Sequence, residues 1–376
     1  MVKIKICIVS PIYPVASKPQ LGKFIHGHSK ELAKQGKDVT LITIGDKKDK
    51  DYEVIDNIKV YRVKEKSRLL FGIRIFALIL KLNKKHRFDI LHSHFVGPLT
   101  VICGIASKLI KVPYVVTARG VGLLPKSFIK KIYLFFPQKI TCVSNYTASL
   151  AREYVDGKKV ISIPNGLDVE RLKPTKNANK FKKELKIKNK KVLLSICNLV
   201  ERKGLDLIIK TLPTVMKEEP NIVYFIIGQG PEKEKLISLA NKLNLKDKVA
   251  FIDYVSDADL ANYFNICDIF LLMSKTIEEK SAIEGFGNVY LEASFMGKPV
   301  IGGKSGGTSD AVVDGKTGFL IEPDDAEELK KKIILLLKNK TLREKMGRYG
   351  RKRVLNGFLW KHNVEKLVKV YSGLLN

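Results

Sequence analysis

The chain has 376 residues, 45% of them hydrophobic, with ordinary amounts of Gly (27) and Pro (14). This length and composition predict a globular protein of two domains, with three as the alternative, and exclude a disordered chain. The formal charge of +30 is uneven, because residues 1–190 hold 39 Lys and Arg against 14 Asp and Glu, whereas residues 191–376 hold 29 against 24.

The five cysteines are scattered without CxxC spacing, which indicates buried thiols in a reducing compartment. The sequence MVKIKICIVSP enters a strand at once, and its apolar run is too short for a signal peptide. No stretch reaches the roughly 18 apolar residues of a membrane-spanning helix. We therefore expect a cytoplasmic protein, either free or attached peripherally to the cytoplasmic face of the membrane.

Strand and helix patterns alternate through the first half of the chain. Strand-like apolar runs occupy 3–10, 38–44, 58–63, 89–95, 113–118, 139–144 and 159–164. Helical spacing of apolar residues is found at 24–35, 70–85, 97–110 and 145–155. Such alternation predicts right-handed crossovers and a parallel sheet, so we expect a Rossmann-like domain over residues 1–170.

A lysine- and asparagine-rich stretch then interrupts the alternation, and we expect residues 171–190 to be a solvated connector. Strand patterns resume at 192–199, 222–228, 248–255, 267–273, 298–303 and 318–323. They predict a second Rossmann-like domain over 191–356, followed by an amphipathic helix in 357–376. Doubly wound sheets bind ligands at the carboxyl ends of their strands, so two such domains are expected to face a cleft.

The stretch EGFGNVYLE, residues 284–292, has the residue types of a nucleotide site. Glu284 is expected in the loop at the carboxyl end of the strand 267–273. Asn288 is expected to cap a helix whose N-terminus attracts phosphate, and Gly287 lets the backbone approach a ligand. Glu292, about one turn inside, could accept hydrogen bonds from vicinal ribose hydroxyls. A solvated charged turn is the alternative.

Further segments accompany EGFGNVYLE in a characteristic order. They are LGKFIHGHSKELAKQGKDVTLIT (21–43), DILHSHF (89–95), CVSNYT (142–147), IPNGLDVERLKP (163–174), ERKG (201–204), IIGQGPEKEKL (226–236), GKPVIGGKSGG (297–307) and DGKTGFLIEP (314–323). On these segments the chain resembles the retaining nucleotide-sugar glycosyltransferases of family 4, which have the GT-B fold.

The resemblance implies an α/β protein of two tandem doubly wound domains, with the C-terminal helix 357–376 crossing back to pack on the first domain. It implies transfer of a hexosyl or related sugar from a nucleotide-diphosphate sugar to an acceptor hydroxyl, with retention, in cell-surface glycan or glycolipid synthesis. The donor would bind mainly to the second domain and the acceptor to the first. No cofactor is implied.

The family motifs assign roles to residues of the second domain. Lys203, with Arg202 beside it, would neutralise the departing diphosphate. Asn198 stands where the family often has an arginine, for which Arg202 could substitute. Glu284 would contact the donor sugar and Glu292 the ribose. The remaining donor-binding residues implied by the motif are Phe286, Gly287, Asn288 and Val289.

Three positions in the first domain are further candidates. His94 matches a histidine that faces the sugar in the family. Gly22 could belong to a glycine loop near the donor phosphates. Arg119 either contacts the acceptor or belongs to a structural turn.

We expect no metal site, since Lys203, Arg202 and a helix N-terminus can serve a diphosphate. The alternative is a divalent cation at DKD (49–51) or DAD (257–259). Two rival functions remain, another GT-B chemistry (a sugar-nucleotide epimerase or phosphorylase) and a non-catalytic binder of anionic membranes or nucleic acid. We do not expect nucleic acid, because aromatics do not alternate with basic residues as in single-strand binders.

The basic first half instead predicts an anionic membrane surface as a partner and an acceptor that is lipid-linked or phosphorylated. The segments 67–88 and 121–136 mix apolar and basic residues and are the expected contact region. Ordinary core helices, or a lysine-rich solvated surface, are the alternatives.

Overall fold

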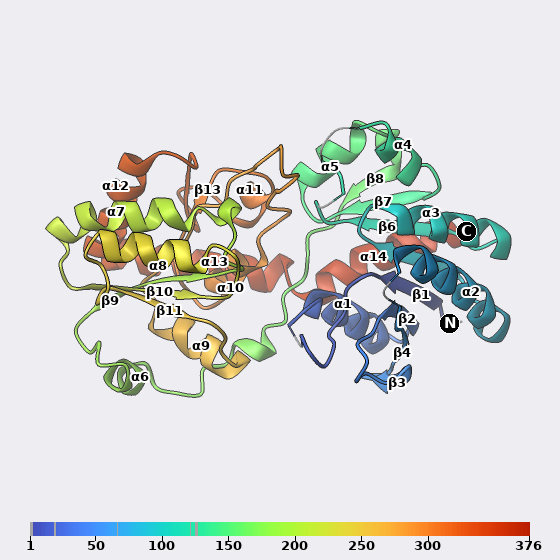
Figure 1. Ribbon diagram of the computed structural model, residues 1–376, viewed down its shortest axis with the longest axis horizontal. Coiled ribbons are helices and arrows are strands. Elements are labelled where there is room, and N and C mark those ends of the chain that lie inside the picture. The colour runs from blue at the N-terminus through green and yellow to red at the C-terminus, as the bar shows by residue number, and fades with distance from the viewer. Residues whose placement is uncertain (1–2, 19, 66, 121, 125–126) are drawn as a thin grey trace. The chain divides into compact units, whose positions relative to one another are not determined.

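The computed structural model describes residues 3–18, 20–65, 67–120, 122–124 and 127–376. The chain divides into two compact units, the first made of residues 1–166, 278–281 and 360–376 and the second of residues 167–277 and 282–359. Each unit is an α/β layer structure around its own sheet (Figure 1). The predicted fold class, two tandem doubly wound domains, is confirmed.

The sheet of the first unit has the strand order β3-β4-β2-β1-β5-β6-β7-β8. All neighbouring strands pair in parallel except β3 and β4. The central strands β1, β5 and β6 are buried on both faces, which is why their sequences read as continuous apolar runs. The strands are β1 (Lys5–Ser10), β2 (Asp38–Ile44), β3 (Tyr52–Ile55), β4 (Ile58–Val63), β5 (Ile90–His94), β6 (Tyr114–Ala118), β7 (Lys139–Cys142) and β8 (Val160–Ser162).

The strand β3 was not predicted from the sequence. It is a short, half-exposed edge strand that forms an antiparallel hairpin with β4, and the turn residues Asp56 and Asn57 have φ of 49° and 62°. Two consecutive residues with positive φ are typical of the two-residue turns that favour Asn and Asp. The sequence signal for this hairpin was therefore the Asp-Asn dipeptide between two short segments in which apolar and polar residues alternate.

Helices cover both faces of this sheet (Figure 1). α1 packs against α14, and α3 packs against both α2 and α4. The helices of the first unit are α1 (Lys23–Lys34), α2 (Arg68–His86), α3 (Pro98–Ile110), α4 (Ile129–Tyr133), α5 (Asn145–Arg152) and α14 (Trp360–Leu375), with a 3-10 turn at Gly157–Lys159.

The C-terminal helix α14 belongs to the first unit, as predicted. Val364, Leu367 and Tyr371 join the core cluster that contains Ile6 of β1 and Ile25 of α1. The chain therefore returns to the first sheet after completing the second unit.

The sheet of the second unit is entirely parallel and has the order β11-β10-β9-β12-β13-β14. The strands are β9 (Lys191–Ile196), β10 (Ile222–Ile227), β11 (Val249–Ile252), β12 (Ile269–Leu272), β13 (Val300–Gly303) and β14 (Gly318–Ile321). The helices are α6 (Ala178–Glu184), α7 (Leu205–Glu218), α8 (Lys233–Lys242), α9 (Asp257–Ile266), α10 (Asn288–Phe295), α11 (Thr308–Ala311), α12 (Ala326–Lys338) and α13 (Lys340–Gly357), with 3-10 turns at Glu170–Leu172 and Glu201–Lys203.

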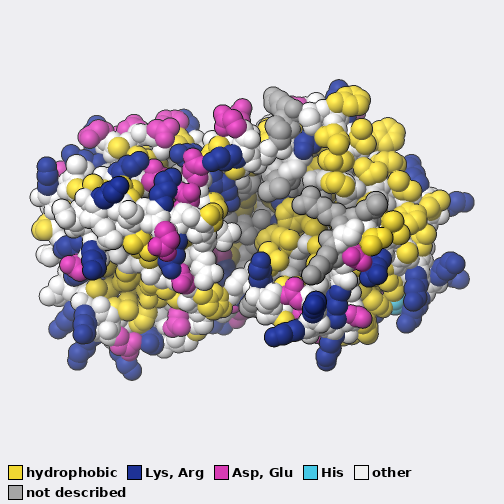
Figure 2. All heavy atoms as spheres, viewed as in Figure 1, with side chains coloured by type: hydrophobic (Ala, Val, Ile, Leu, Met, Phe, Trp, Pro, Cys, Tyr) yellow, Lys and Arg dark blue, Asp and Glu magenta, His cyan; other side chains and the backbone are white. Residues whose placement is uncertain are grey.

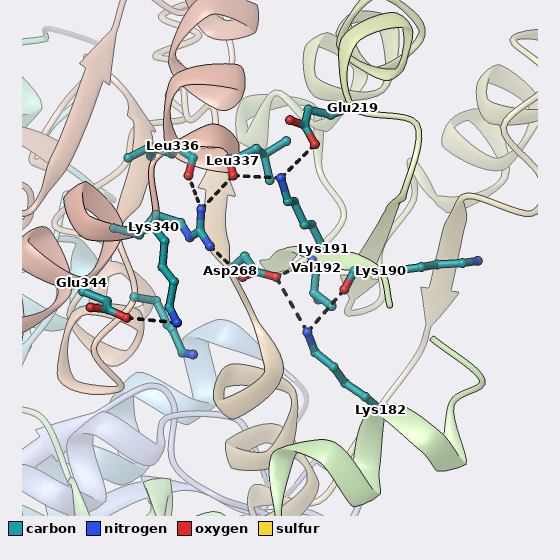
Figure 3. A network of polar contacts seen from close by, with 12 residues as sticks. Lys182, Lys190, Lys191, Val192, Glu219, Asp268, Leu336, Leu337, Lys340 and Glu344 are labelled. Atoms are coloured by element: carbon teal, nitrogen blue, oxygen red, sulfur yellow. Dashed lines mark hydrogen bonds and ion pairs between the residues drawn. The ribbon is translucent and has the colours of Figure 1, made fainter. Parts of the chain in front are cut away.

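The segment expected to be a solvated connector is instead packed onto the second unit. It contains α6, whose Phe181 is buried against Tyr263 of α9 with ring centroids 5.2 Å apart. A polar network at the amino ends of β9 and β12 also connects this segment to the second unit (Figure 3). There Asp268 accepts a hydrogen bond from the Val192 N–H at 2.8 Å and pairs with Lys182 at 3.9 Å.

No helix in the described part of the chain is both long enough and apolar enough to cross a membrane.

Candidate active site

The second sheet has its topological switch point between β9 and β12. The chain continues from β9 toward β10 and β11 on one side, and from β12 toward β13 and β14 on the other. Ligands of open α/β sheets bind outside the carboxyl ends of the strands at such a point. Lys203 follows β9 and Glu284 follows β12, so the topology brings two predicted residues to this edge of the sheet.

Glu284 lies at the centre of a polar cluster there. Its Oε2 accepts hydrogen bonds from Nη1 of Arg202 at 2.9 Å, from Oγ of Ser274 at 3.1 Å and from the ammonium group of Lys203. Glu284 and Lys203 are each 7% exposed. The structure therefore joins three of the predicted residues and adds Ser274, which sequence reasoning missed. Asn198, after β9, is exposed.

The charges of this cluster depend on one another. Burial by itself raises the pKa of Glu284, but the positive charges of Lys203 and Arg202 and their hydrogen bonds outweigh burial and lower this pKa to about 2. The carboxyl group is therefore ionised at neutral pH. Two cations and one anion leave the cluster with an excess of positive charge, which suits an anionic ligand.

Gly204 explains how the turn can approach β12 so closely. It has φ of 61°, and a Cβ atom there would overlap the carbonyl oxygen of Met273, the residue after β12. The 3-10 turn Glu201–Lys203 can therefore lie directly against the end of β12. Any other residue at 204 would be strained and would push Lys203 away from Glu284.

The N-terminus of α10 adjoins this cluster. Asn288 was predicted to cap the helix, but the cap residue is Gly287, with φ of 88°, and Asn288 is the first helical residue. A Cβ on Gly287 would lie 3.7 Å from Cγ of Glu284, so the helix start is in contact range of the carboxylate side chain. Phe286 is buried and stacks on Phe358 with ring centroids 6.1 Å apart, while Val289 is half-buried.

Glu292 lies in the second turn of α10 and is 7% exposed. Its Oε1 accepts a hydrogen bond from Nη2 of Arg171, which also pairs with Asp257 at 3.4 Å. The negative charge of Glu292 raises the pKa of Arg171. Arg171 was not predicted, although it belongs to IPNGLDVERLKP, a segment that carried the family resemblance. Asp257 was a candidate metal ligand and is part of this ion pair instead.

The first unit has its own switch point, between β1 and β5. Gly22 follows β1 as the N-cap of α1, with φ of 70°, and His94 is the last residue of β5. Arg119 follows β6, next to β5. Its Nη2 lies 3.2 Å from Nδ1 of His94, and its Nη1 donates to Oδ1 of Asn165 at 2.7 Å. Asn165 was missed, although it too lies in the segment 163–174.

The contact with Arg119 determines the tautomer of His94. A guanidinium group can only donate, so Nδ1 of His94 must accept. Burial and the neighbouring His92 and Arg119 lower the pKa of His94 well below its usual value, so the ring is neutral and carries its proton on Nε2. This N–H has no hydrogen-bond partner among the described residues, and His94 lines a small cavity. His94 is therefore a neutral donor.

A chain of hydrogen bonds beneath His94 ties α14 to the sheet. The hydroxyl of Tyr371 lies 2.6 Å from Nδ1 of His92, and Nε2 of His92 lies 2.7 Å from Oγ1 of Thr117, which contacts Thr141 at 2.7 Å. All four side chains are buried. His92 and His94 are two residues apart on one face of β5, with ring centroids 4.6 Å apart, so α14 helps to fix the surroundings of His94.

No group of three or more His, Cys, Asp or Glu side chains among the described residues has an arrangement that could hold a metal ion. Asp49, part of the other candidate metal motif, accepts from the N–H groups of Ala16 and Asp46.

Two protein-family models match the chain, "Glycosyltransferase Family 4" over residues 21–171 and "Glycosyl transferases group 1" over residues 176–353. The O-antigen biosynthesis glycosyltransferase WclY of Escherichia coli is 30% identical over 309 residues, which cover 77% of this chain and 78% of WclY. The GDP-mannose-dependent alpha-(1-6)-phosphatidylinositol monomannoside mannosyltransferase of Mycolicibacterium smegmatis is 30% identical over 236 residues. These residues are 62% of either chain, so this match spans about three-fifths of the mycobacterial relative.

The fold has close neighbours among solved structures. An Anabaena protein solved in complex with UDP-glucose superposes with a TM-score of 0.79 at 18% identity, over 98% of this chain and 100% of that one. The two switch-point clusters, the order of the motifs and these matches agree with one another, and the chain belongs to the group 1 glycosyltransferases of family 4, with the GT-B fold.

Proposed function

We propose that this protein transfers a hexosyl or related sugar from a nucleotide-diphosphate sugar to an acceptor hydroxyl, with retention at the anomeric carbon. The observation that carries the proposal is the cluster of Lys203, Arg202 and Glu284 at the switch point of the second sheet, beside the start of α10. Family membership supplies the class of reaction.

The cluster suits a departing nucleoside diphosphate. As the bond between the anomeric carbon and the phosphate oxygen breaks, negative charge develops on the diphosphate, and positioned donors stabilise it. Lys203 has three N–H donors and Arg202 has five. Glu284 accepts from one nitrogen of each side chain, so other N–H groups remain for the diphosphate. Glu284 holds both cations in place before the donor arrives and offers its second oxygen to a sugar hydroxyl. The start of α10 adds a partial positive charge.

Glu292 is proposed to bind the ribose of the nucleotide. One of its oxygens accepts from Arg171, which fixes the orientation of the carboxylate. The other oxygen can accept from the ribose hydroxyls. Arg171 is then a positioning residue for this contact.

In the first unit, His94 is proposed to donate its Nε2–H to a hydroxyl of a substrate. Retention is expected through departure and attack on the same face of the sugar. The acceptor oxygen then bonds to the anomeric carbon and its proton passes to the leaving phosphate oxygen. This route needs no protein base, which agrees with a neutral His94 of strongly lowered pKa. Arg119 is proposed to act through His94.

The acceptor is proposed to be lipid-linked or phosphorylated and to be met at an anionic membrane surface on the cytoplasmic side. Support comes from the excess of basic residues in the first half of the chain and from the mycobacterial relative, whose name includes phosphatidylinositol monomannoside, a lipid. The products would be cell-surface glycans or glycolipids. No metal or other cofactor is proposed, because Lys203 and Arg202 supply the charge that a diphosphate requires.

The test is a panel of UDP-, GDP- and ADP-sugars incubated with the purified protein, with release of the nucleoside diphosphate as the readout. We expect release that depends on one donor and increases with acceptor, and an anomeric proton in the product with the donor's configuration by NMR. An inverted product would contradict retention. Donor consumption without an acceptor-linked product would favour an epimerase or hydrolase.

A further inference from the structure

Three neighbouring helices of the first unit expose large apolar side chains to solvent. Among the described residues, seventeen large apolar side chains are exposed, and eight of them belong to this one region: Leu70, Ile73, Ile105, Leu109, Phe128, Ile129, Ile132 and Phe135. Phe128 is 74% exposed and Phe135 71%. Single exposed apolar residues are ordinary, but a group of this size marks an interaction site.

These side chains form one continuous face. α3 is the middle helix, since Gly72 of α2 lies against Ile102 of α3, and Gly104 of α3 lies against Phe136, which follows α4. Figure 2 shows apolar side chains gathered over α3 and α4, with Lys and Arg side chains along the outer margin. We call the exposed surface of α2, α3 and residues 127–136 the docking face.

The docking face is basic as well as apolar. Residues 67–139 contain thirteen Lys and Arg and a single acidic residue, Asp89. The exposed side of α2 carries apolar residues in its first half and lysines in its second half. Lysines also lie among the exposed apolar residues of α3 and α4. The lysines in or directly after the three helices are Lys81, Lys84, Lys85, Lys108, Lys111, Lys130 and Lys131. None of these seven lysines forms an ion pair with a residue that the structure describes.

A shallow groove at the end of α3 brings two of these cations together. It is lined by Lys108, Lys111 and Gln138, among others. Leu109, 62% exposed, lies between the two lysines in sequence. Two ammonium groups beside an exposed leucine suit a phosphate whose attached chain is apolar, because lysine binds phosphate as a point charge.

A second copy of the chain is a poor occupant for this face. In a two-fold dimer the same patch meets itself, so the unpaired lysines of one copy would face those of the other. Nucleic acid would satisfy the lysines but would bury the isoleucine and leucine side chains against sugar and phosphate. A lipid bilayer with anionic headgroups satisfies both, because apolar groups enter the acyl boundary while lysines remain at the phosphates.

We propose that the docking face inserts Phe128, Phe135 and the adjoining aliphatic side chains into the headgroup layer of an anionic membrane, with Lys108 and Lys111 on lipid phosphates. The inference rests on the proposed function for its purpose, since a lipid-linked acceptor lies in such a surface. Beyond the attraction between lysines and anionic headgroups, apolar side chains contribute to membrane attachment. Raising the salt concentration therefore weakens binding but does not abolish it, because salt screens only the charged contacts.

The experiment is flotation with vesicles of phosphatidylcholine alone or with 30 mol% phosphatidylglycerol, at low and high salt. We expect the wild-type chain to bind the anionic vesicles and to remain partly bound at high salt. Phe128→Ser with Phe135→Ser lowers the bound fraction at least tenfold at high salt, whereas Lys108→Gln with Lys111→Gln lowers it mainly at low salt. The matched control, Tyr349→Ser with Leu355→Ser on α13, replaces exposed apolar residues of the second unit and leaves binding unchanged.

Flotation of the phenylalanine variant at the wild-type level would overturn the proposal. So would a wild-type dimer, seen by light scattering, that dissociates in that variant, because the face would then be a contact between copies. Calorimetric binding of UDP or GDP is measured on every variant as a separate readout. Unchanged nucleotide binding together with lost flotation supports the docking face, and absent nucleotide binding with intact flotation contradicts the proposed function alone.

Discussion

The oxygen Oε2 of Glu284 accepts from three donors, and Lys203 is the more buried of the two that are cations. The carboxylate therefore holds the side chain of Lys203 in one position. At the scale of single residues, the proposed site has its charges arranged in the absence of a substrate. This is the condition under which electrostatic stabilisation of a leaving group is most effective.

Lys203→Ala is expected to lower kcat by roughly 100-fold, as the loss of one positioned donor to a developing anion does. Lys203→Arg restores part of the rate, because charge is kept while the shape of the donor changes. The measurement is steady-state release of nucleoside diphosphate. Lys173→Ala is the control, since its side chain is 71% exposed and pairs with the exposed Glu170. A change confined to the KM of the acceptor would remove Lys203 from the diphosphate site.

Glu292→Gln is expected to weaken donor binding tenfold or more, because a hydrogen bond to a charged group contributes about 1.5–3 kcal/mol. Isothermal titration with the nucleotide measures this loss. The substitution also weakens the ion pair with Arg171, so thermal unfolding is recorded in parallel. Lower stability with unchanged nucleotide affinity would assign Glu292 a structural role.

His94→Gln is expected to retain more activity than His94→Leu, because an amide N–H can replace the donor at Nε2. The loss in His94→Leu is about fivefold, the value of one neutral hydrogen bond of about 1 kcal/mol. The pKa of His94 is lowered well below 6.5, so the ring stays neutral as the pH falls from 8 to 6 and adds no acidic limb to the pH profile of kcat. An acidic limb near pH 6.5 that disappears in His94→Gln would show that this residue is a base.

At the scale of elements, strands with buried apolar runs were predicted well, and segments whose burial depends on distant residues were not. β9 and β10 read as strands because both faces of the sheet are covered. The helix α6 was missed because four of its seven residues are lysine or asparagine. Its one buried residue, Phe181, packs against Tyr263, which lies far along the chain.

The same distinction holds for the site. Lys203, Arg202 and Glu284 were predicted because short motifs contain them, and the structure brings them together. Arg171 and Asn165 were missed because each acts on a residue far away in sequence, Glu292 and Arg119 respectively. Such pairings follow from the fold, and local pattern alone contains no signal for them.

Tyr371→Phe tests how α14 supports the first unit. The substitution removes the hydroxyl that contacts Nδ1 of the buried His92, so a polar atom loses its partner at a cost of about 1–3 kcal/mol. We expect a lower Tm in differential scanning calorimetry. Tyr349→Phe is the control, because Tyr349 is 45% exposed on α13. Equal Tm values for the two variants would show that the contact contributes nothing to stability.

At the scale of the whole molecule, the positive charge is distributed differently from what the two halves of the sequence suggested. By the boundaries of the units, the first holds 34 Lys and Arg against 14 Asp and Glu, and the second holds 34 against 24. The lysines of 173–191 therefore belong to the second unit. What distinguishes the first unit is the near absence of acids in residues 67–139, the region that contains the docking face.

The return of α14 to the first unit has a consequence for how the protein is made. Ribosomes synthesise the chain from its N-terminus, and domains usually fold in that order. Here the core around Ile6 and Ile25 gains Val364, Leu367 and Tyr371 only after the whole second unit has been synthesised. The domain that is translated first is thus the one completed last. A nascent chain carries an uncovered apolar face until α14 emerges, and a chain that terminates before α14 never covers it.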